Sequence, residues 1–140
     1  MRRRQARELA LKVLFQVDVA GADADEAMSF LLGEEKVSER ALRFATDLVR
    51  GTLEHLDEID ATLANLSREW TLERMANIDR NVLRIGCYEL MYCDDIPASV
   101  AISEAIEISR KYGDAESSRF VNGILGAIVQ NLNVKSRAID

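Results

Sequence analysis

Apolar residues recur along the chain at the three- and four-residue spacing of helices that bury one face. The clearest series opens the sequence and predicts a helix over residues 3–19, with an inward stripe of Ala6, Leu9, Ala10, Val13, Leu14 and Val17. Gly21 is expected to end this helix. One proline and seven glycines in 140 residues leave most of the chain free to be helical. The pattern therefore predicts an all-α protein.

The same spacing predicts further helices over residues 25–32, 38–66, 78–92, 98–112 and 117–132, and one helical turn within 70–75. Gly33 is expected to stop the second helix, and Ser38 to cap the third, which Gly51 could bend. Together these elements predict one domain over residues 1–140, with about seven helices. They fall into two helical subdomains, 1–66 and 67–133, and the tail 134–140 is expected to be loose.

The helix predicted over residues 78–92 is apolar around nearly its whole circumference. Such a helix is either central in a fold or shared with a partner. Glu89 projects among its apolar residues and should be paired if it is buried.

The amino-acid composition excludes several classes of protein function. The chain is 48% hydrophobic and 30% charged, with no apolar run long enough for a membrane span, so we expect a cytoplasmic protein. Its cysteines, Cys87 and Cys93, match neither a metal nor a redox spacing, and its one histidine cannot form a site alone. No nucleophile–base pair and no glycine-rich phosphate loop are present. We therefore expect no catalysis, no metal and no cofactor.

Charge is distributed unevenly. Residues 1–12 carry a net charge of +4, whereas the rest of the chain carries −10. Arginines in a first helical turn oppose the helix dipole, which suggests that they have a use. A helical wheel places Phe15 opposite the apolar stripe, among cations that could neutralise phosphates while the ring stacks on a base. The candidate RNA-binding residues of this helix are Arg2, Arg3, Arg4, Arg7, Lys12 and Phe15. The alternative is that Phe15 packs under the third helix and the arginines are only solvated.

A second candidate lies at the start of the last helix, where free N–H groups favour phosphate. Arg119, Phe120 and Asn122 would contribute a cation, a half-exposed ring and an amide. Gly123 and Gly126 follow inside the same helix at a cost in helix propensity, which predicts close packing against another helix.

Four stretches together resemble the family of the transcription antitermination factor NusB. They are residues 3–16 (RRQARELALKVLFQ), Ile78-Asp79-Arg80 with the following 82–90, residues 100–107 (VAISEAIE) and residues 120–125 (FVNGIL). The resemblance covers almost the full length in the family's order. Two positions depart from it: Glu116 stands where an aspartate is frequent, and Gly86-Cys87 replaces a bulkier apolar pair.

The resemblance implies an all-helical fold and binding of the boxA element of ribosomal RNA leaders. It also implies a heterodimer with ribosomal protein NusE, which acts with the other Nus factors on RNA polymerase, and some family members form homodimers that cover the RNA surface. By position, the first-helix arginines, Phe15, Arg119 and Phe120 would contact RNA. Asp79, Val82 and Leu83 would lie towards NusE.

Two other interpretations remain. The family-like domain also occurs at the N-terminus of ribosomal RNA cytosine methyltransferases, but no nucleotide-binding βαβ segment is present here. A helical adaptor that binds only protein would differ in salt dependence, because only an RNA complex releases counterions from phosphates.

Overall fold

The computed structural model describes residues 2–34, 36–67 and 71–139, with the side chains of residues 3–132 within those ranges. The helices there are α1 (Arg2–Ala20), α2 (Ala24–Glu34), α3 (Glu39–Glu54), α4 (Leu56–Leu66), the 3₁₀ turn η1 (Leu72–Arg74), α5 (Asn77–Tyr92), α6 (Ala98–Tyr112) and α7 (Ser117–Ile139). The all-α prediction is confirmed. No helix in these ranges is long and apolar enough to cross a membrane.

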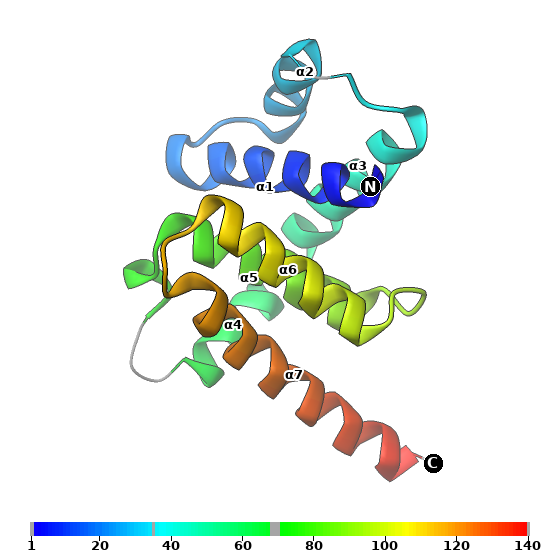
Figure 1. Cartoon of the computed structure of the whole chain (residues 1–140), viewed down its shortest axis with the longest axis vertical. Helices are drawn as coiled ribbons and strands as arrows, with labels where there is room; N and C mark the ends of the chain where they lie inside the picture. Colours follow the sequence, from blue (N-terminus) through cyan, green and yellow to red (C-terminus); the bar gives the residue numbers. More distant parts are fainter. Residues whose placement is uncertain (1, 35, 68–70, 140) are drawn as a thin grey trace.

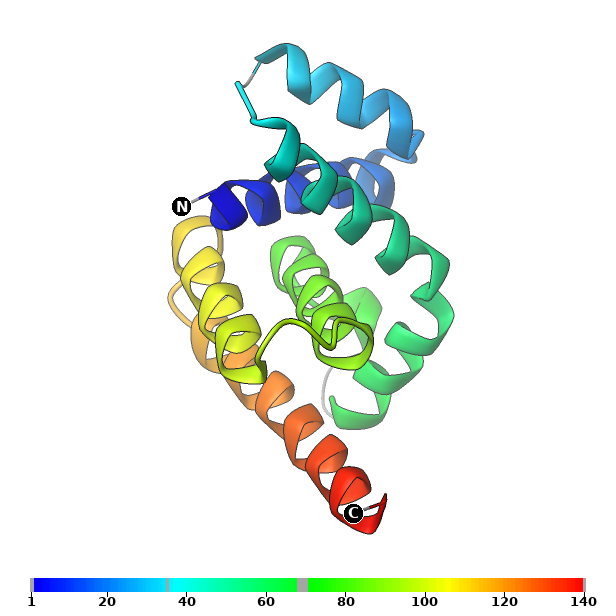
Figure 2. The ribbon, with the colours of Figure 1, turned by 90° about the vertical axis from the view of Figure 1, so that its right-hand side faces the viewer.

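Helix α5 is central. It packs against α1, α3, α4, α6 and α7, and Figure 2 shows it enclosed by the other helices. Helix α1 crosses above α5 and α6, and α2 lies across the outer side of α1 (Figure 1). The fully buried side chains come from both halves of the chain and include Leu9, Val13, Leu48, Ile59, Leu83, Val121 and Leu125. Of the two roles predicted for an all-round apolar helix, α5 therefore has the structural one.

The predicted bounds of α1, α5 and α6 agree with the structure to within a residue. Gly21 ends α1 as expected, with a φ of 66° that side chains rarely adopt. Three other ends are wrong. Helix α2 continues through Gly33 to Glu34, α7 continues past residue 132 to Ile139, and the long third helix is two helices that meet at His55.

Gly51 lies inside α3 rather than at the break. A Cβ built there would be 2.1 Å from Cζ of Tyr88. The glycine thus allows the ring from α5 to lie directly on the α3 backbone. Gly123 and Gly126 behave differently, because a Cβ at either position meets nothing within 4 Å. The close packing predicted for these two glycines is wrong.

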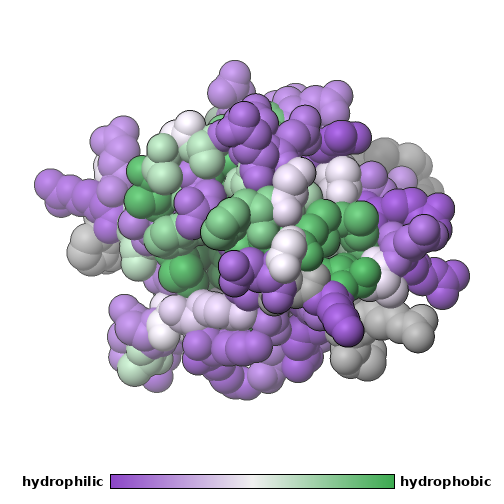
Figure 3. Space-filling model, turned by 90° about the horizontal axis from the view of Figure 1, so that it is seen from above, coloured by the Kyte–Doolittle hydropathy of each residue, from purple (hydrophilic) through white to green (hydrophobic). Residues whose placement is uncertain are grey.

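The outer end of the molecule carries exposed apolar surface. Phe30 on α2 is 70% exposed and Val19 at the end of α1 is 49% exposed. Figure 3 looks down on this end and shows hydrophobic side chains gathered in its middle, with hydrophilic ones around them.

Asp18 joins α1 to the start of α5 through charged hydrogen bonds. It accepts them from Nε and Nη2 of Arg80, at 2.8 and 2.6 Å, and from Nδ2 of Asn81 at 3.0 Å. Arg84 lies 3.5 Å from the same carboxylate and also pairs with Asp60 on α4 at 2.9 Å. Burial opposes ionisation of Asp18, but the hydrogen bonds and charges of these partners lower its pKa.

Asp18→Asn is expected to lower the free energy of unfolding by about 1.5–3 kcal/mol at pH 7, the range for hydrogen bonds to charged groups. A lowered pKa in the folded state contributes stability above the unfolded pKa of about 3.9, and this contribution is lost as the pH falls through the folded pKa. Urea unfolding at pH 7 and pH 3 measures it. The difference between the two proteins should shrink at pH 3, and an equal difference at both values would contradict the assignment.

Candidate nucleic-acid interface

The first half of α1 is held on α6 by ion pairs. Arg4 donates from Nε and Nη2 to both carboxylate oxygens of Glu104, at 2.9 and 2.7 Å. The hydrogen bond and the charge of Arg4 lower the pKa of Glu104. One turn later, Glu8 accepts hydrogen bonds from Lys111 at 2.8 Å and from the Tyr112 hydroxyl at 2.7 Å. The α1 face that was predicted to be open is therefore covered in its first half by α6.

Arg7 is inside the protein, with 3% of its side chain exposed. Its Nε and Nη2 donate to the carboxylate of Glu89 on α5, which is 1% exposed, and the closest N···O distance is 2.7 Å. Burial raises the pKa of Glu89, while the hydrogen bonds and charge of Arg7 oppose that rise. The prediction that Glu89 would be paired is confirmed. The predicted position of Arg7 on an RNA-binding face is wrong.

The other cations of α1 differ in how far their side chains are exposed to solvent. Arg3 is exposed, and its guanidinium lies 4.6 Å from the ring centroid of Phe44. Arg4 keeps 40% of its side chain exposed despite Glu104. Lys12 is half-buried. The side chain of Arg2 lies outside the part of the chain that is described.

Phe15 is half-buried and lies outside the cluster of core residues and the apolar side chains packed on it. It belongs to the second half of α1. In the view of Figure 1, that half, the start of α5 and the start of α7 lie towards the same edge of the molecule. The two aromatic candidates, Phe15 and Phe120, thus belong to segments from opposite ends of the sequence that share this edge of the view.

The start of α7 presents the second group of candidates. Arg119 is 87% exposed, and its nearest acid is Glu116 at 4.0 Å. Asn122 is exposed, whereas Phe120 is half-buried and packs on the core. Ser117 accepts a hydrogen bond from the Asp114 N–H at 3.0 Å and donates to its carboxylate at 3.2 Å, which fixes the turn before the helix.

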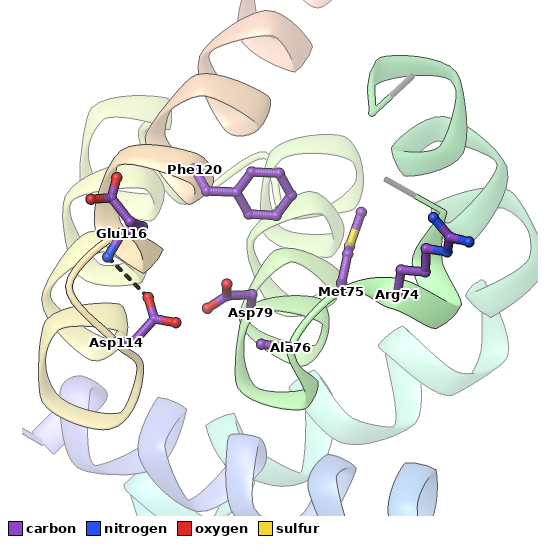
Figure 4. A pocket seen from close by; sticks show the side chains of 7 residues that line it. All are labelled: Arg74, Met75, Ala76, Asp79, Asp114, Glu116 and Phe120. Atoms are coloured by element: carbon purple, nitrogen blue, oxygen red, sulfur yellow. Dashed lines mark hydrogen bonds between the residues drawn. The ribbon is translucent and has the colours of Figure 1, made fainter. Parts of the chain in front are cut away.

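A pocket of about 250 Å³ separates this corner from the start of α5. Figure 4 shows the Phe120 ring on one side, Met75 and Arg74 on the other, and Asp79 between them. Asp79 is 8% exposed, and its Oδ1 has no hydrogen-bond partner within the described residues. Burial, as the larger cause, and the charge of Asp114 raise the pKa of Asp79. The pocket thus offers a ring face beside an acceptor that lacks a donor.

Val82 and Leu83, the other two residues predicted to face NusE, do not line this pocket. They are 2% and 0% exposed and belong to the core. Their predicted position at a partner surface is wrong, and of the three residues assigned to that surface only Asp79 lines the pocket beside Phe120.

Sequence reasoning missed the acidic residues that hold the cations. Glu104 stands 100 positions from Arg4, and no local pattern links them. Arg74 and Met75 were likewise read only as part of a helical turn, although they form one wall of the Asp79 pocket.

Comparison with known proteins accords with this architecture. A model of the NusB family matches residues 4–130. The transcription antitermination protein NusB of Pelotomaculum thermopropionicum is 53% identical over 133 residues, which cover 94% of this chain and 91% of that protein. A structure of T. maritima NusB superposes with a TM-score of 0.86 at 38% identity, covering 93% of this chain and 92% of that one. A chain in the crystal structure of antitermination factors NusB and NusE in complex with dsRNA gives a TM-score of 0.84 at 28% identity, covering 92% and 96%. The chain belongs to the NusB family.

Proposed function

We propose that this protein is a non-catalytic, cytoplasmic transcription antitermination factor that binds boxA-type single-stranded RNA together with NusE. The observation that carries the proposal is the full-length match to a NusB fold that has been crystallised with NusE and RNA. The cations of α1 and α7 and the rings of Phe15 and Phe120 support it, because such side chains can neutralise phosphates and stack bases.

The proposed RNA surface is smaller than the sequence suggests. It consists of Arg3, Arg4, Lys12, Phe15, Arg119, Phe120 and Asn122. Arg2, whose side chain lies outside the described part of the chain, is proposed from the sequence alone. Arg7 has a structural role instead, since a phosphate would have to displace the buried Glu89 to reach it.

NusE is proposed to bind beside Asp79, with Val82 and Leu83 supporting that surface from the core. Because Asp79 and Phe120 line one pocket, the RNA surface and the NusE surface would meet there. Such a junction gives a physical reason for the two partners to bind cooperatively, since each would complete the pocket for the other.

The carboxylate of Glu104 competes with RNA for Arg4. Glu104→Gln is expected to raise affinity for boxA RNA about two- to fivefold, the effect of about one exposed ion pair. It should leave the log–log salt slope near its wild-type value, because Arg4 neutralises one phosphate in either complex. Fluorescence anisotropy with labelled RNA measures both quantities.

Glu107→Gln is the matched control for this change. Glu107 lies on the same helix and pairs with Arg110 at 2.8 Å, so its loss changes the net charge equally while Arg4 keeps its hydrogen bonds to Glu104. Equal gains in affinity for the two variants would show a general charge effect and would contradict competition at Arg4.

Transcription in vitro tests the proposed function. The template would carry boxA upstream of a terminator, with RNA polymerase, NusE and the other Nus factors present. Adding the protein is expected to increase readthrough on this template and not on one with a scrambled boxA. Equal readthrough on both templates would overturn the proposal.

A further inference from the structure

A second cavity, of about 350 Å³, lies between the later turns of α3, the end of α5 and the connection to α6. Figure 2 faces this side, with that connection at the front and α3 beside it. The cavity is distinct from the pocket at Asp79 and shares no lining residue with it among those described. Its size is at the lower end of the range for small-ligand sites, which suits a side chain rather than a length of nucleic acid.

Two stacked tyrosines form one wall. The rings of Tyr88 and Tyr92 are 5.6 Å apart between centroids. Gly51 allows the first ring to lie on the α3 backbone, while the second stacks on His55 at 4.0 Å and donates its hydroxyl proton to Glu58. The wall is therefore held in place before any ligand arrives.

The rim of the cavity is acidic. Asp47, Glu54 and Asp95 line it and are exposed, and no ion pair to them is found within the described ranges. Arg50 is the one cation among the described lining residues, and its guanidinium lies towards Asp25 on α2, at 3.8 Å. The negative potential reaches inwards. Burial raises the pKa of Tyr88 first, and Cys93, Asp47 and Glu54 add to that rise.

We propose that this cavity binds an arginine side chain from a basic segment of a protein partner. A guanidinium can stack on a tyrosine face while its N–H groups meet carboxylates, and it does so better than an ammonium. Another lining residue of the cavity already shows this chemistry, because the guanidinium of Arg3 lies 4.6 Å from the ring centroid of Phe44. The carboxylates would repel RNA phosphates. The site therefore extends the proposed function with a protein contact that does not depend on RNA.

Nuclear magnetic resonance with the full-length, ¹⁵N-labelled protein tests the site. The probe is an acetylated peptide of alternating glycine and arginine, and the control is the same peptide with neutral citrulline. The arginine peptide is expected to shift the amides of Gly51, Tyr88, Tyr92 and Asp95 in a saturable way, and the citrulline peptide should bind at least about tenfold more weakly. Absence of saturable shifts at these amides would overturn the proposal.

Variants distinguish binding in the cavity from a general attraction between the acidic protein and the arginine peptide. The double variant Glu54→Gln with Asp95→Asn is expected to lower the affinity for the arginine peptide about tenfold, as for two exposed charge contacts. Tyr92→Leu is expected to lower the same affinity about fivefold. Glu26→Gln with Glu73→Gln removes the same charge from exposed positions elsewhere and should change binding less than twofold. Equal weakening by the two charge pairs would overturn the assignment. Binding of boxA RNA, measured in parallel, should be unchanged by all three, so failure of this site and failure of the RNA proposal are distinguishable.

Discussion

Glu89→Ala is expected to lower the free energy of unfolding by about 3–5 kcal/mol, because it leaves the Arg7 guanidinium buried without its partner. Total stabilities of domains are about 5–15 kcal/mol, so the variant should unfold at much lower urea concentration. Glu104, whose Oε1 lies 3.8 Å from Nη1 of Arg7, is too far away to replace the lost hydrogen bonds. Urea unfolding followed by circular dichroism measures the effect.

The double variant Arg7→Met with Glu89→Leu is the control for this prediction. Removing both partners avoids the unpaired charge, so most of the lost stability should return. A single variant that loses less than about 1 kcal/mol, or a double variant as unstable as the single one, would show that the pair does not hold α1 on α5.

Phe15→Leu and Phe120→Leu are each expected to weaken boxA RNA binding by about 1–3 kcal/mol, the contribution of one stacked base. This corresponds to a rise in Kd of about fivefold to about 140-fold. Leucine keeps apolar volume at these half-buried positions. A loss of RNA affinity would therefore come from the missing aromatic ring rather than from disturbed packing. Fluorescence anisotropy with labelled RNA measures it.

Phe30→Leu provides the matched control. Phe30 is 70% exposed on α2, away from the start of α7, and its replacement should leave RNA affinity unchanged. Wild-type affinity in both test variants, with the fold verified by circular dichroism, would contradict the stacking role.

Periodicity predicted most of the helices because burial of one face dominates their formation. It assigned α1 and α6 to within a residue, and it placed α5 correctly because a helix apolar on all sides must be covered on all sides. It failed at His55, where the chain breaks between two helices whose apolar patterns run on continuously. Glycine was a poor guide to that break, since Gly51 serves the approach of Tyr88 instead.

The candidate site was predictable in kind but not in detail. A helical wheel gives the direction of Arg7 from the axis of α1, but it cannot reveal that Glu89, 82 positions away, meets it inside the protein. Val82 and Leu83 were assigned to a partner surface only by family resemblance, whereas the all-round apolar pattern of α5 already favoured their burial. The half-exposure of the Phe120 ring was predicted correctly from its angle to the apolar stripe of α7, while the roles of Phe120 and Arg119 in RNA binding stay predictions.

Titration of labelled boxA RNA with the protein, with and without NusE and at two salt concentrations, tests the central claim most directly. Four cations of the proposed surface, Arg3, Arg4, Lys12 and Arg119, should give a log–log salt slope near about −3 for single-stranded RNA. NusE should tighten the complex, and a scrambled RNA should bind weakly in every arm. RNA binding that does not depend on salt concentration, on RNA sequence or on NusE would contradict the account. A helical adaptor that binds only protein would then be the better description.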